Sequence, residues 1–360
     1  MKKIIGAILL MAIAYLALWP VPVEPVAWEA PDAPGYTGDF TENTALQDLE
    51  LFPLPEGRHG PEDIAIGEDG ALYIAVGEGE ILRRDPATGA ITVWAVTGGR
   101  PLGIEPAPEG GFYVADAYRG LLRVTSTVVE VLANTDAAGG EILYADDLDV
   151  APDGSVWFTD ASTKFGAEAS GGTLAGSYLE ILEHGRTGRI LQWDPETGVA
   201  TERLGDISFA NGLAMGPTGE WLLYIETGEY ALHRLWIEGP RAGESDVVLA
   251  NLPGFPDNIN RDAAGGFLMG LVSKRAGAVD ALSGYPFLRK VVQRLPAVIR
   301  PKAVSHGFVI SLDETGAVQR TWQDPTGAYP LTTGAISDAD GALWITSLGA
   351  TSLARLPKRD

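Results

Sequence analysis

The stretch Asp146–Asp160, DDLDVAPDGSVWFTD, has a pattern that recurs along the chain and indicates its fold. An aliphatic segment runs into Pro-Asp-Gly, and a segment rich in aromatic and β-branched residues follows. Asp-Gly is favoured in tight hairpins because the turn needs a residue with positive φ. The stretch therefore predicts two antiparallel strands joined at Gly154.

This pattern occurs six times, and the turn glycine always lies eight residues after the first residue of the copy. The copies begin at Glu62, Leu102, Asp146, Asn211, Asp257 and Thr333, which are 40, 44, 65, 46 and 76 residues apart. A period of about 40–50 residues is typical of a four-stranded propeller blade. We predict an all-β, six-bladed β-propeller over residues 46–357, with a strand near residues 46–55 closing the ring.

The two long spacings predict insertions at residues 164–188 and 274–304, in the third and fifth blades. Within the second insertion, residues 281–299 have the pattern of a basic amphipathic helix. Such a helix would lie over one face of the propeller, against a membrane, or simply on the surface. We expect the substrate pocket to lie under both insertions.

The N-terminus has the pattern of an export segment. Lys2 and Lys3 precede an apolar run from Ile4 to Trp19, which is typical of a signal anchor or a signal peptide in residues 1–20. An anchor is favoured because no small-residue cleavage site follows at once. Either would place the rest of the chain outside the cytoplasm, in the periplasm or a lumen, or secrete it after cleavage. Residues 21–45 are expected to be a stiff Pro-rich linker outside the fold.

Composition excludes several classes of site. The chain has 26 basic and 48 acidic residues and a net charge of −22, which disfavours nucleic acid and anionic lipid as partners. It has no cysteine, so disulfides, zinc–thiolate sites and cysteine nucleophiles are excluded. Its four histidines lack the HExxH spacing of a zinc site.

The register predicts a ring of polar side chains at the mouth of the channel, because the first strand of each blade lines it. The ring position is Glu62, Leu102, Asp146, Asn211, Asp257 and Thr333 in turn, and the next position adds Asp63, Asp147 and Asn258. Aliphatic residues such as Ile64 and Ile104 are expected to line the channel below the ring.

Converging carboxylates repel unless their pKa values rise or a cation neutralises them. Oxygen donors without histidine or cysteine favour Ca²⁺. The predicted ligands are Glu62, Asn211, Asp257 and Asn258, with Asp146 completing the shell directly or through water. The alternative is that these side chains only cap the strand starts. At the ends of the second strands, Asp116, Asp160 and Glu226 are expected either to orient the ligands or to face solvent.

Three long motifs carry a resemblance to a known family. GPEDIAI (60–66), ADDLDVAPDGSVWFTDASTKFG (145–166) and NLPGFPDNINRDAAGGFLMGLVSKR (251–275) resemble the strictosidine-synthase-like family, especially its adipocyte plasma-membrane-associated protein branch. Gluconolactonases, regucalcin and paraoxonases are more distant relatives. The resemblance implies a six-bladed propeller with Ca²⁺ at the channel mouth, held by Glu62, Asn211, Asp257 and Asn258. Asp146 stands where the family usually has asparagine.

The sequence departs from two catalytic patterns of these relatives. Strictosidine synthases use a glutamate in the last blade, but the corresponding stretch YPLTTGAISDADG (329–341) has none. The histidine dyad of paraoxonases is replaced by Leu102 and Asp116. We therefore expect neither the strictosidine condensation nor a histidine-based hydrolysis.

The leading hypothesis is a Ca²⁺-dependent esterase or lactonase acting on a small-molecule substrate. Water would be the nucleophile, Asp257 the general base and Asp146 or Asp147 its reserve. Asn211 and Asn258 would hold the metal and help bind the oxyanion, whereas His59 is expected to be a loop histidine without a role. The alternative is a non-enzymatic, membrane-tethered propeller that binds a ligand or protein and holds a structural calcium. No G-x-S-x-G serine motif occurs.

Overall fold

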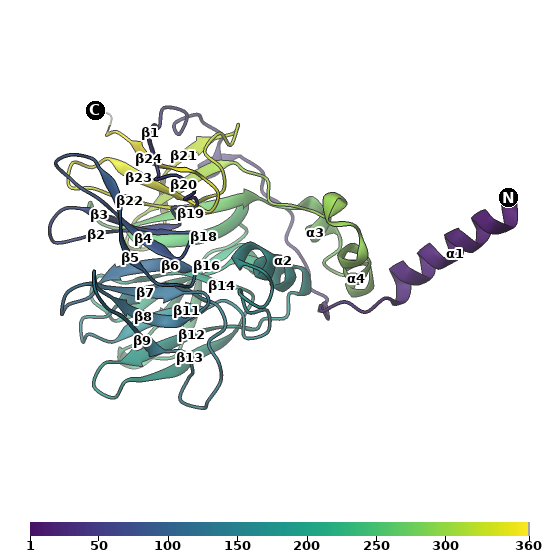
Figure 1. The fold of residues 1–360 in the computed structure, drawn as a ribbon, viewed down its shortest axis with the longest axis horizontal. Helices are drawn as coiled ribbons and strands as arrows, with labels where there is room; N and C mark the ends of the chain where they lie inside the picture. The colour runs from purple at the N-terminus through teal and green to yellow at the C-terminus, as the bar shows by residue number, and fades with distance from the viewer. Residues whose placement is uncertain (359–360) are drawn as a thin grey trace.

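The computed structural model describes residues 1–358, whose strands form six antiparallel, four-stranded sheets (Figure 1). Each inner strand packs beside the inner strand of the next blade, and β22 packs beside β2, so the ring is closed. Blades 1 to 3 contain β2 Asp63–Ile66, β3 Leu72–Val76, β4 Glu80–Arg84 and β5 Ile91–Val96; β6 Pro101–Pro106, β7 Phe112–Asp116, β8 Gly120–Val124 and β9 Val129–Ala133; and β10 Ala145–Val150, β11 Val156–Asp160, β12 Gly188–Asp194 and β13 Val199–Ile207. Blades 4 to 6 contain β14 Ala210–Met215, β15 Trp221–Glu226, β16 Ala231–Trp236 and β17 Ser245–Leu249; β18 Gly254–Arg261, β19 Phe267–Lys274, β20 Gly307–Leu312 and β21 Val318–Asp324; and β22 Thr332–Ser337, β23 Leu343–Ser347, β24 Ser352–Leu356 and β1 Glu50–Pro53. The six-bladed propeller is confirmed.

The turn glycines explain why the six hairpins share one register. All six have positive φ, from 71° at Gly70 to 97° at Gly265. This region of φ is strained for residues with a Cβ atom, which is why glycine occupies the position.

The ring closes by pairing the N-terminal part of the propeller with its end. β1 runs antiparallel to β24, with Leu51 opposite Ala354. The last blade is therefore built from both ends of the propeller sequence, as the stretch near residues 46–55 predicts.

The aliphatic residues after the ring position do not line the channel, contrary to expectation. Ile64 packs with Trp344 and Leu353, and Ile104 packs with Tyr73 and Phe112, in clusters between neighbouring blades. In blades 2 to 6, a break of register at the ring position turns the aliphatic side chain toward the neighbouring sheet. In blade 1, β2 pairs with β3 in regular register, and Ile64 faces the blade interface without a bulge. Burial of these side chains between blades holds the ring together.

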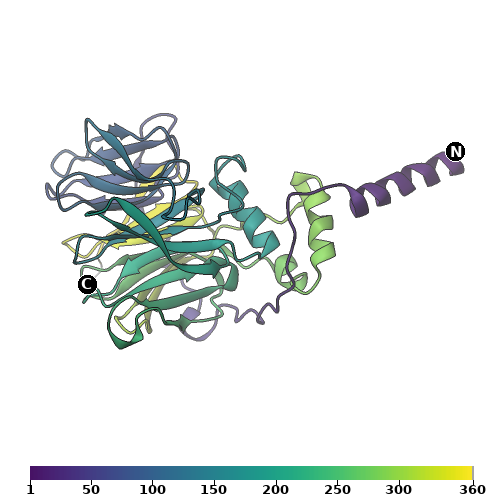
Figure 2. The same cartoon turned by 90° about the horizontal axis from the view of Figure 1, so that it is seen from below.

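Both predicted insertions carry helices on one side of the propeller (Figure 2). The first insertion contains α2, Thr173–Glu183, and the second contains α3, Gly277–Ala281, and α4, Pro286–Arg294. The single helix expected over residues 281–299 is thus wrong in its bounds, because Gly284 and Pro286 interrupt it. Short 3₁₀ turns lie at Gly38–Phe40, Thr227–Glu229, Gly239–Arg241 and Ala297–Ile299.

The N-terminal apolar run forms α1, Lys2–Leu18, which extends away from the rest of the molecule (Figure 1). Among residues 1–358, no helix is both long enough and apolar enough to cross a membrane.

Apart from the 3₁₀ turn Gly38–Phe40, residues 21–45 are extended, but they are packed rather than free, which corrects the expectation of a linker outside the fold. Val23 is fully buried, and the N–H of Val26 donates to the carbonyl of Glu183 at 2.9 Å. Trp28 stacks on His184 with ring centroids 4.1 Å apart. Arg289 donates to the carbonyls of Val26, Leu182 and Ser283. This segment, called the strap below, ties the two insertions to each other.

Candidate functional site

The ring residues lie at irregularities in the inner strands. In blades 2 to 6, register shifts between the residue before the ring position and the residue two after it, as between Ala145 and Leu148 or Ala210 and Leu213. Bulges of this kind re-aim side chains and are frequent beside functional sites. Five of the six ring side chains are thereby displaced from the regular alternation of the strand.

Direct hydrogen bonds join the predicted ligands across blades. Asn211 donates from Nδ2 to Oδ1 of Asp257 at 2.6 Å and to Oγ1 of Thr227 at 3.2 Å. Asn258 donates from Nδ2 to Oε1 of Glu62 at 2.9 Å. The structure therefore brings Asn211 beside Asp257, and Asn258 beside Glu62.

Four buried side-chain oxygens of the ring have no hydrogen-bond partner within the described residues. They are Oε2 of Glu62, Oδ2 of Asp146, Oδ1 of Asn211 and Oδ2 of Asp257. The exposed fractions of these residues are only 2 to 6%. A buried oxygen without a partner is unfavourable, so these four oxygens are available to bind a cation or a hydrogen-bond donor.

Burial perturbs the acids of the ring. Burial, followed by the charges of Asp257 and Asp63, raises the pKa of Glu62 well above its usual range. Burial and the charges of Glu62 and Asp257 do the same to the pKa of Asp146. Burial raises the pKa of Asp257 to about 7, although the hydrogen bond from Asn211 opposes the rise. Without a cation, the ring favours protonated acids.

The donor set fits a hard cation. The free atoms are three carboxylate oxygens and one amide oxygen, which is the ligand chemistry of Ca²⁺ rather than of zinc. Within residues 1–358, no group of three or more acidic, histidine or cysteine side chains is arranged to hold a metal by itself. An ion at the ring would therefore also need the amide oxygen of Asn211.

The residues after the ring position connect neighbouring blades. Asp63 accepts a hydrogen bond from the N–H of Ile104 at 3.1 Å, and Asp147 accepts one from the N–H of Leu213 at 2.8 Å. Blade 2 has Gly103 at this position, where a Cβ atom would lie 2.6 Å from Oδ1 of Asp147. Asp147 is thus engaged between blades and is absent from the residues that line the pocket described below.

The acids at the ends of the second strands are buried, so they do not face solvent. Asp116, Asp160 and Glu226 each accept a backbone N–H ahead of an inner strand, from Arg100, Tyr144 and Ser208 at 2.8–2.9 Å. Asp160 also pairs with Arg189 at 3.0 Å. Their contacts position the strand starts and do not reach the ring ligands directly. His59, which pairs with Glu78 at the surface, is likewise outside the pocket.

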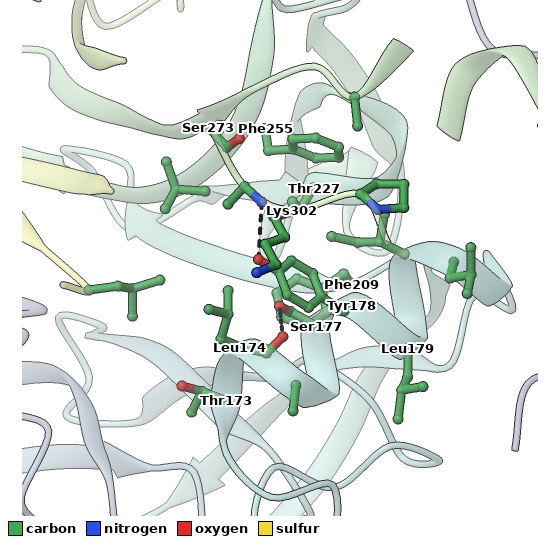
Figure 3. Close-up of a pocket in the computed structure, with 18 of the residues that line it drawn as sticks. Thr173, Leu174, Ser177, Tyr178, Leu179, Phe209, Thr227, Phe255, Ser273 and Lys302 are labelled. Carbon is green, nitrogen blue, oxygen red and sulfur yellow. Dashed lines mark hydrogen bonds between the residues drawn. The ribbon is translucent and has the colours of Figure 1, made fainter. Parts of the chain in front are cut away.

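A cavity of about 580 Å³ lies over the ring, under both insertions, as predicted. Glu62, Asp146, Asn211 and Asp257 lie at its base, and α2 and the second insertion contribute mostly apolar walls. Figure 3 shows side chains of α2 on one side of this space, Phe255 and Ser273 on the other, and Lys302 between them. Asn258 does not line the cavity, although it donates a hydrogen bond to Glu62, which does.

Sequence reasoning missed two pocket residues that touch the ring. Thr227 accepts from Asn211 and donates from Oγ1 to the carbonyl of Pro256 at 2.8 Å. Tyr144 lines the cavity, and burial with the charges of Asp146 and Asp257 raises the pKa of its hydroxyl well above 10. Tyr144 lies two residues before the repeated motif and Thr227 lies in a 3₁₀ turn, so the six-fold register gives no signal for either.

A serine, a histidine and a glutamate also align beneath the strap. Oγ of Ser208 lies 3.3 Å from Nδ1 of His184, and Nε2 of His184 lies 2.9 Å from Glu229. Ser208 has no exposed surface, and Trp28 stacks on the His184 ring. No pocket residue belongs to this group within the described chain, so it serves packing rather than catalysis in this structure.

The sequence matches two family descriptions over segments that include three of the ring residues, Glu62, Asp146 and Asn211. Residues 38–84 match the N-terminal domain of the strictosidine synthase-like family, and residues 146–240 match strictosidine synthase. The adipocyte plasma membrane-associated protein of Salmo salar is 30% identical over 377 residues, which cover 98% of this chain and 88% of that protein.

Solved structures with the same fold include a gluconolactonase and a calcium-binding protein. A gluconolactonase from Xanthomonas campestris superposes with a TM-score of 0.61 at 17% identity, covering 94% of this chain and 98% of its own. A calcium-binding protein, regucalcin, from Agrobacterium tumefaciens superposes with a TM-score of 0.58 at 16% identity, covering 85% and 93%. At these identities the likeness shows the fold alone.

Proposed function

The chain belongs to the strictosidine synthase-like family, and from this premise we propose that it is a Ca²⁺-dependent hydrolase of carboxylic esters or lactones. We further propose that α1 tethers it to a membrane, with the propeller outside the cytoplasm. The names of the similar proteins support these proposals: one is membrane-associated, one is a gluconolactonase and one binds calcium.

One observation carries the proposal: at the base of an apolar cavity lie four buried oxygens that have no partner among residues 1–358. Glu62, Asp146, Asn211 and Asp257 would hold the ion, and Asn258 would orient Glu62 through its hydrogen bond. When bound, Ca²⁺ would polarise the carbonyl group of the substrate. The apolar walls favour a substrate with a hydrophobic acyl or alcohol part.

The side chains of the ring supply the proton transfers. Asp257 is held through Oδ1 by Asn211, and its Oδ2, which would also be a ligand of the ion, would accept a proton from the attacking water. The water oxygen bonds to the carbonyl carbon, the bond to the alcohol oxygen breaks, and Asp257 returns the proton to that oxygen. The products are the carboxylic acid and the alcohol.

The oxyanion needs a donor other than the two asparagines. The Nδ2 groups of Asn211 and Asn258 already donate to Asp257 and Glu62. We infer that the hydroxyl of Tyr144, which stays protonated in the cavity, donates a hydrogen bond to the developing oxyanion.

The test is hydrolysis of phenyl acetate and of a panel of small lactones, with chelator and after restoring Ca²⁺. We expect activity that chelator abolishes and that Asp257→Ala loses. Activity that is absent, or that persists in chelator and in Asp257→Ala, would contradict the proposal. If chelator lowers only the melting temperature, the calcium is structural and the protein is a membrane-tethered binding propeller.

A further inference from the structure

The second insertion exposes an unusual number of apolar side chains beyond the cavity. Around α4, the exposed fractions are 60% for Tyr285, 56% for Phe287, 78% for Val298 and 61% for Ile299. Other residues of the same insertion, Val292 and Ala297, line the cavity. The segment therefore has one side toward the pocket and an apolar side left uncovered by the described chain.

This uncovered side lies next to α1. Arg294 donates from Nε to the carbonyl of Trp19 at 2.6 Å and from Nη1 to the carbonyl of Leu16 at 2.9 Å. Phe287 precedes Arg294 by seven residues, about two helical turns, and so lies on the same side of α4. None of the side chains of α1 is buried by residues 1–358. In both views α3 and α4 lie between the propeller and α1 (Figures 1 and 2).

The connection between α1 and the strap is short. Leu18 ends α1, Val23 is fully buried in the strap, and only four residues lie between them. Such a connection spans at most about 18 Å even when extended. Any apolar layer that takes up α1 must therefore lie close to α4.

The second insertion carries positive charge around α4, whereas the whole molecule is strongly negative. Residues 284–304 contain five basic residues and no acidic one, whereas the chain carries −22. Arg289 and Arg294 are buried by the strap and α1, which leaves Lys290, Arg300 and Lys302 to face outward or to the pocket rim. The net charge disfavours anionic lipid for the whole molecule, but this local surface is complementary to it.

We propose that α1, α4 and the turn Ala297–Ile299 form one lipid-docking face, which lays the pocket mouth on the surface of a bilayer. α1 enters the hydrocarbon layer, and Phe287, Val298 and Ile299 rest in the interface. The pocket would then take its ester or lactone from the lipid phase, which favours amphipathic substrates. This last point rests on the proposed function, whereas the docking itself does not.

Single-cysteine variants of the full chain test the docking, because the protein has no cysteine of its own. Phe287→Cys and Val298→Cys place an environment-sensitive fluorophore on the docking face. Leu51→Cys and Val247→Cys, at residues 57% and 60% exposed on the outer strands β1 and β17, are the matched controls. Each protein is reconstituted in phosphatidylcholine vesicles with and without phosphatidylserine, with lipid-borne and water-soluble quenchers.

We expect the two probes on the docking face to shift to the blue and to be quenched by the lipid-borne quencher at least severalfold more than the controls. Replacing both Arg300 and Lys302 by glutamate should remove any strengthening by phosphatidylserine. If probes at Phe287 and Val298 remain as accessible to the aqueous quencher as those at Leu51 and Val247, the docking proposal is wrong, whatever the outcome of the hydrolysis assay. If docking is seen but hydrolysis is equal for a short-chain ester in water and a long-chain ester in the vesicle, the substrate part is wrong.

Discussion

Asn211 and Asp257, 46 residues apart in sequence, are joined across two neighbouring blades by a hydrogen bond of 2.6 Å. The bond occupies Nδ2 of the amide and Oδ1 of the carboxylate, and it leaves Oδ1 of Asn211 and Oδ2 of Asp257 buried and without partners in the described residues. The pair thus presents two oxygens to the cavity in a fixed orientation. Fixed ligands reduce the entropy lost when an ion or a substrate is bound.

Asp257→Asn keeps the shape of the side chain but removes the charge and the basic oxygen. We expect ester hydrolysis to fall by about 10²–10⁴, the range for losing a general base, while the protein stays folded. The matched control is Asp340→Asn, in an exposed hairpin turn of blade 6, which should hydrolyse at the parental rate. Equal losses in both variants would point to a non-specific effect and contradict the assigned role.

Asp146 tests whether charge or oxygen is needed at its position. Asp146→Asn retains a side-chain oxygen and relieves the repulsion from Glu62 and Asp257 that raises the pKa of Asp146. We expect it to keep measurable Ca²⁺ binding and activity, whereas Asp146→Ala should lose both. Calorimetric titration with Ca²⁺ makes the comparison. Indistinguishable affinities for the two variants would remove Asp146 from the ligand set.

Thr227 has a positioning role, since its hydroxyl links Asn211 to the carbonyl of Pro256. Thr227→Val has the same shape but neither hydrogen bond, and we expect Ca²⁺ affinity to fall by about 10–100-fold. Thr227→Ser retains the hydroxyl and should rescue the affinity. A valine variant that binds like the parent, or a serine variant as weak as valine, would contradict this role.

The acids of the ring predict how stability depends on pH. The pKa of Asp257 is raised from 3.8 to about 7 in the folded protein, so the native state holds more protons than the unfolded state between these values. Metal-free protein should therefore lose stability as pH rises from about 4 to 7. Ca²⁺ competes with protons for the same oxygens, so its stabilising effect should be larger at pH 8 than at pH 5. Melting temperatures across pH, with Ca²⁺ and with chelator, measure both trends.

Arg289 should stabilise the folded protein through its contacts with the strap, far from the ring. Arg289→Met fills a similar volume but no longer donates to the carbonyls of Val26, Leu182 and Ser283. We expect a loss of roughly 1–3 kcal/mol in the free energy of unfolding and faster proteolysis within residues 21–45. Lys290→Met, the next position, serves as the control. Proteolysis at the parental rate would mean that the strap is held by its other contacts.

The six-bladed fold could be predicted from the sequence because the turn glycine lies at the same place in each of the six repeats. The constant spacing to glycines such as Gly70 and Gly154 reflects a single backbone requirement, positive φ in a hairpin turn. The same spacing predicts that Glu62, Asp146, Asn211 and Asp257 lie together, and all four line one pocket. Their functional roles remain predictions.

Other features depend on contacts that no repeat encodes. In blades 2 and 3, a bulge at the ring position turns Ile104 and Leu148 toward the neighbouring blade. Regular alternation along the strand predicts that these side chains line the channel, and this is wrong because the bulge depends on tertiary contacts. The strap is held by Arg289 and by the Trp28–His184 stack, which join residues far apart in sequence. Proline content predicted its extended form correctly but not its packing.

We expect hydrolysis in the cavity to need one Ca²⁺ at the ring below it. The most direct measurement is a titration of free Ca²⁺ in which phenyl acetate hydrolysis and the melting temperature are followed on the same chelator-treated protein. Both should rise with the same midpoint, and Asp257→Asn should abolish the rise in hydrolysis. A melting temperature that rises with Ca²⁺ while hydrolysis stays absent or constant would contradict this expectation.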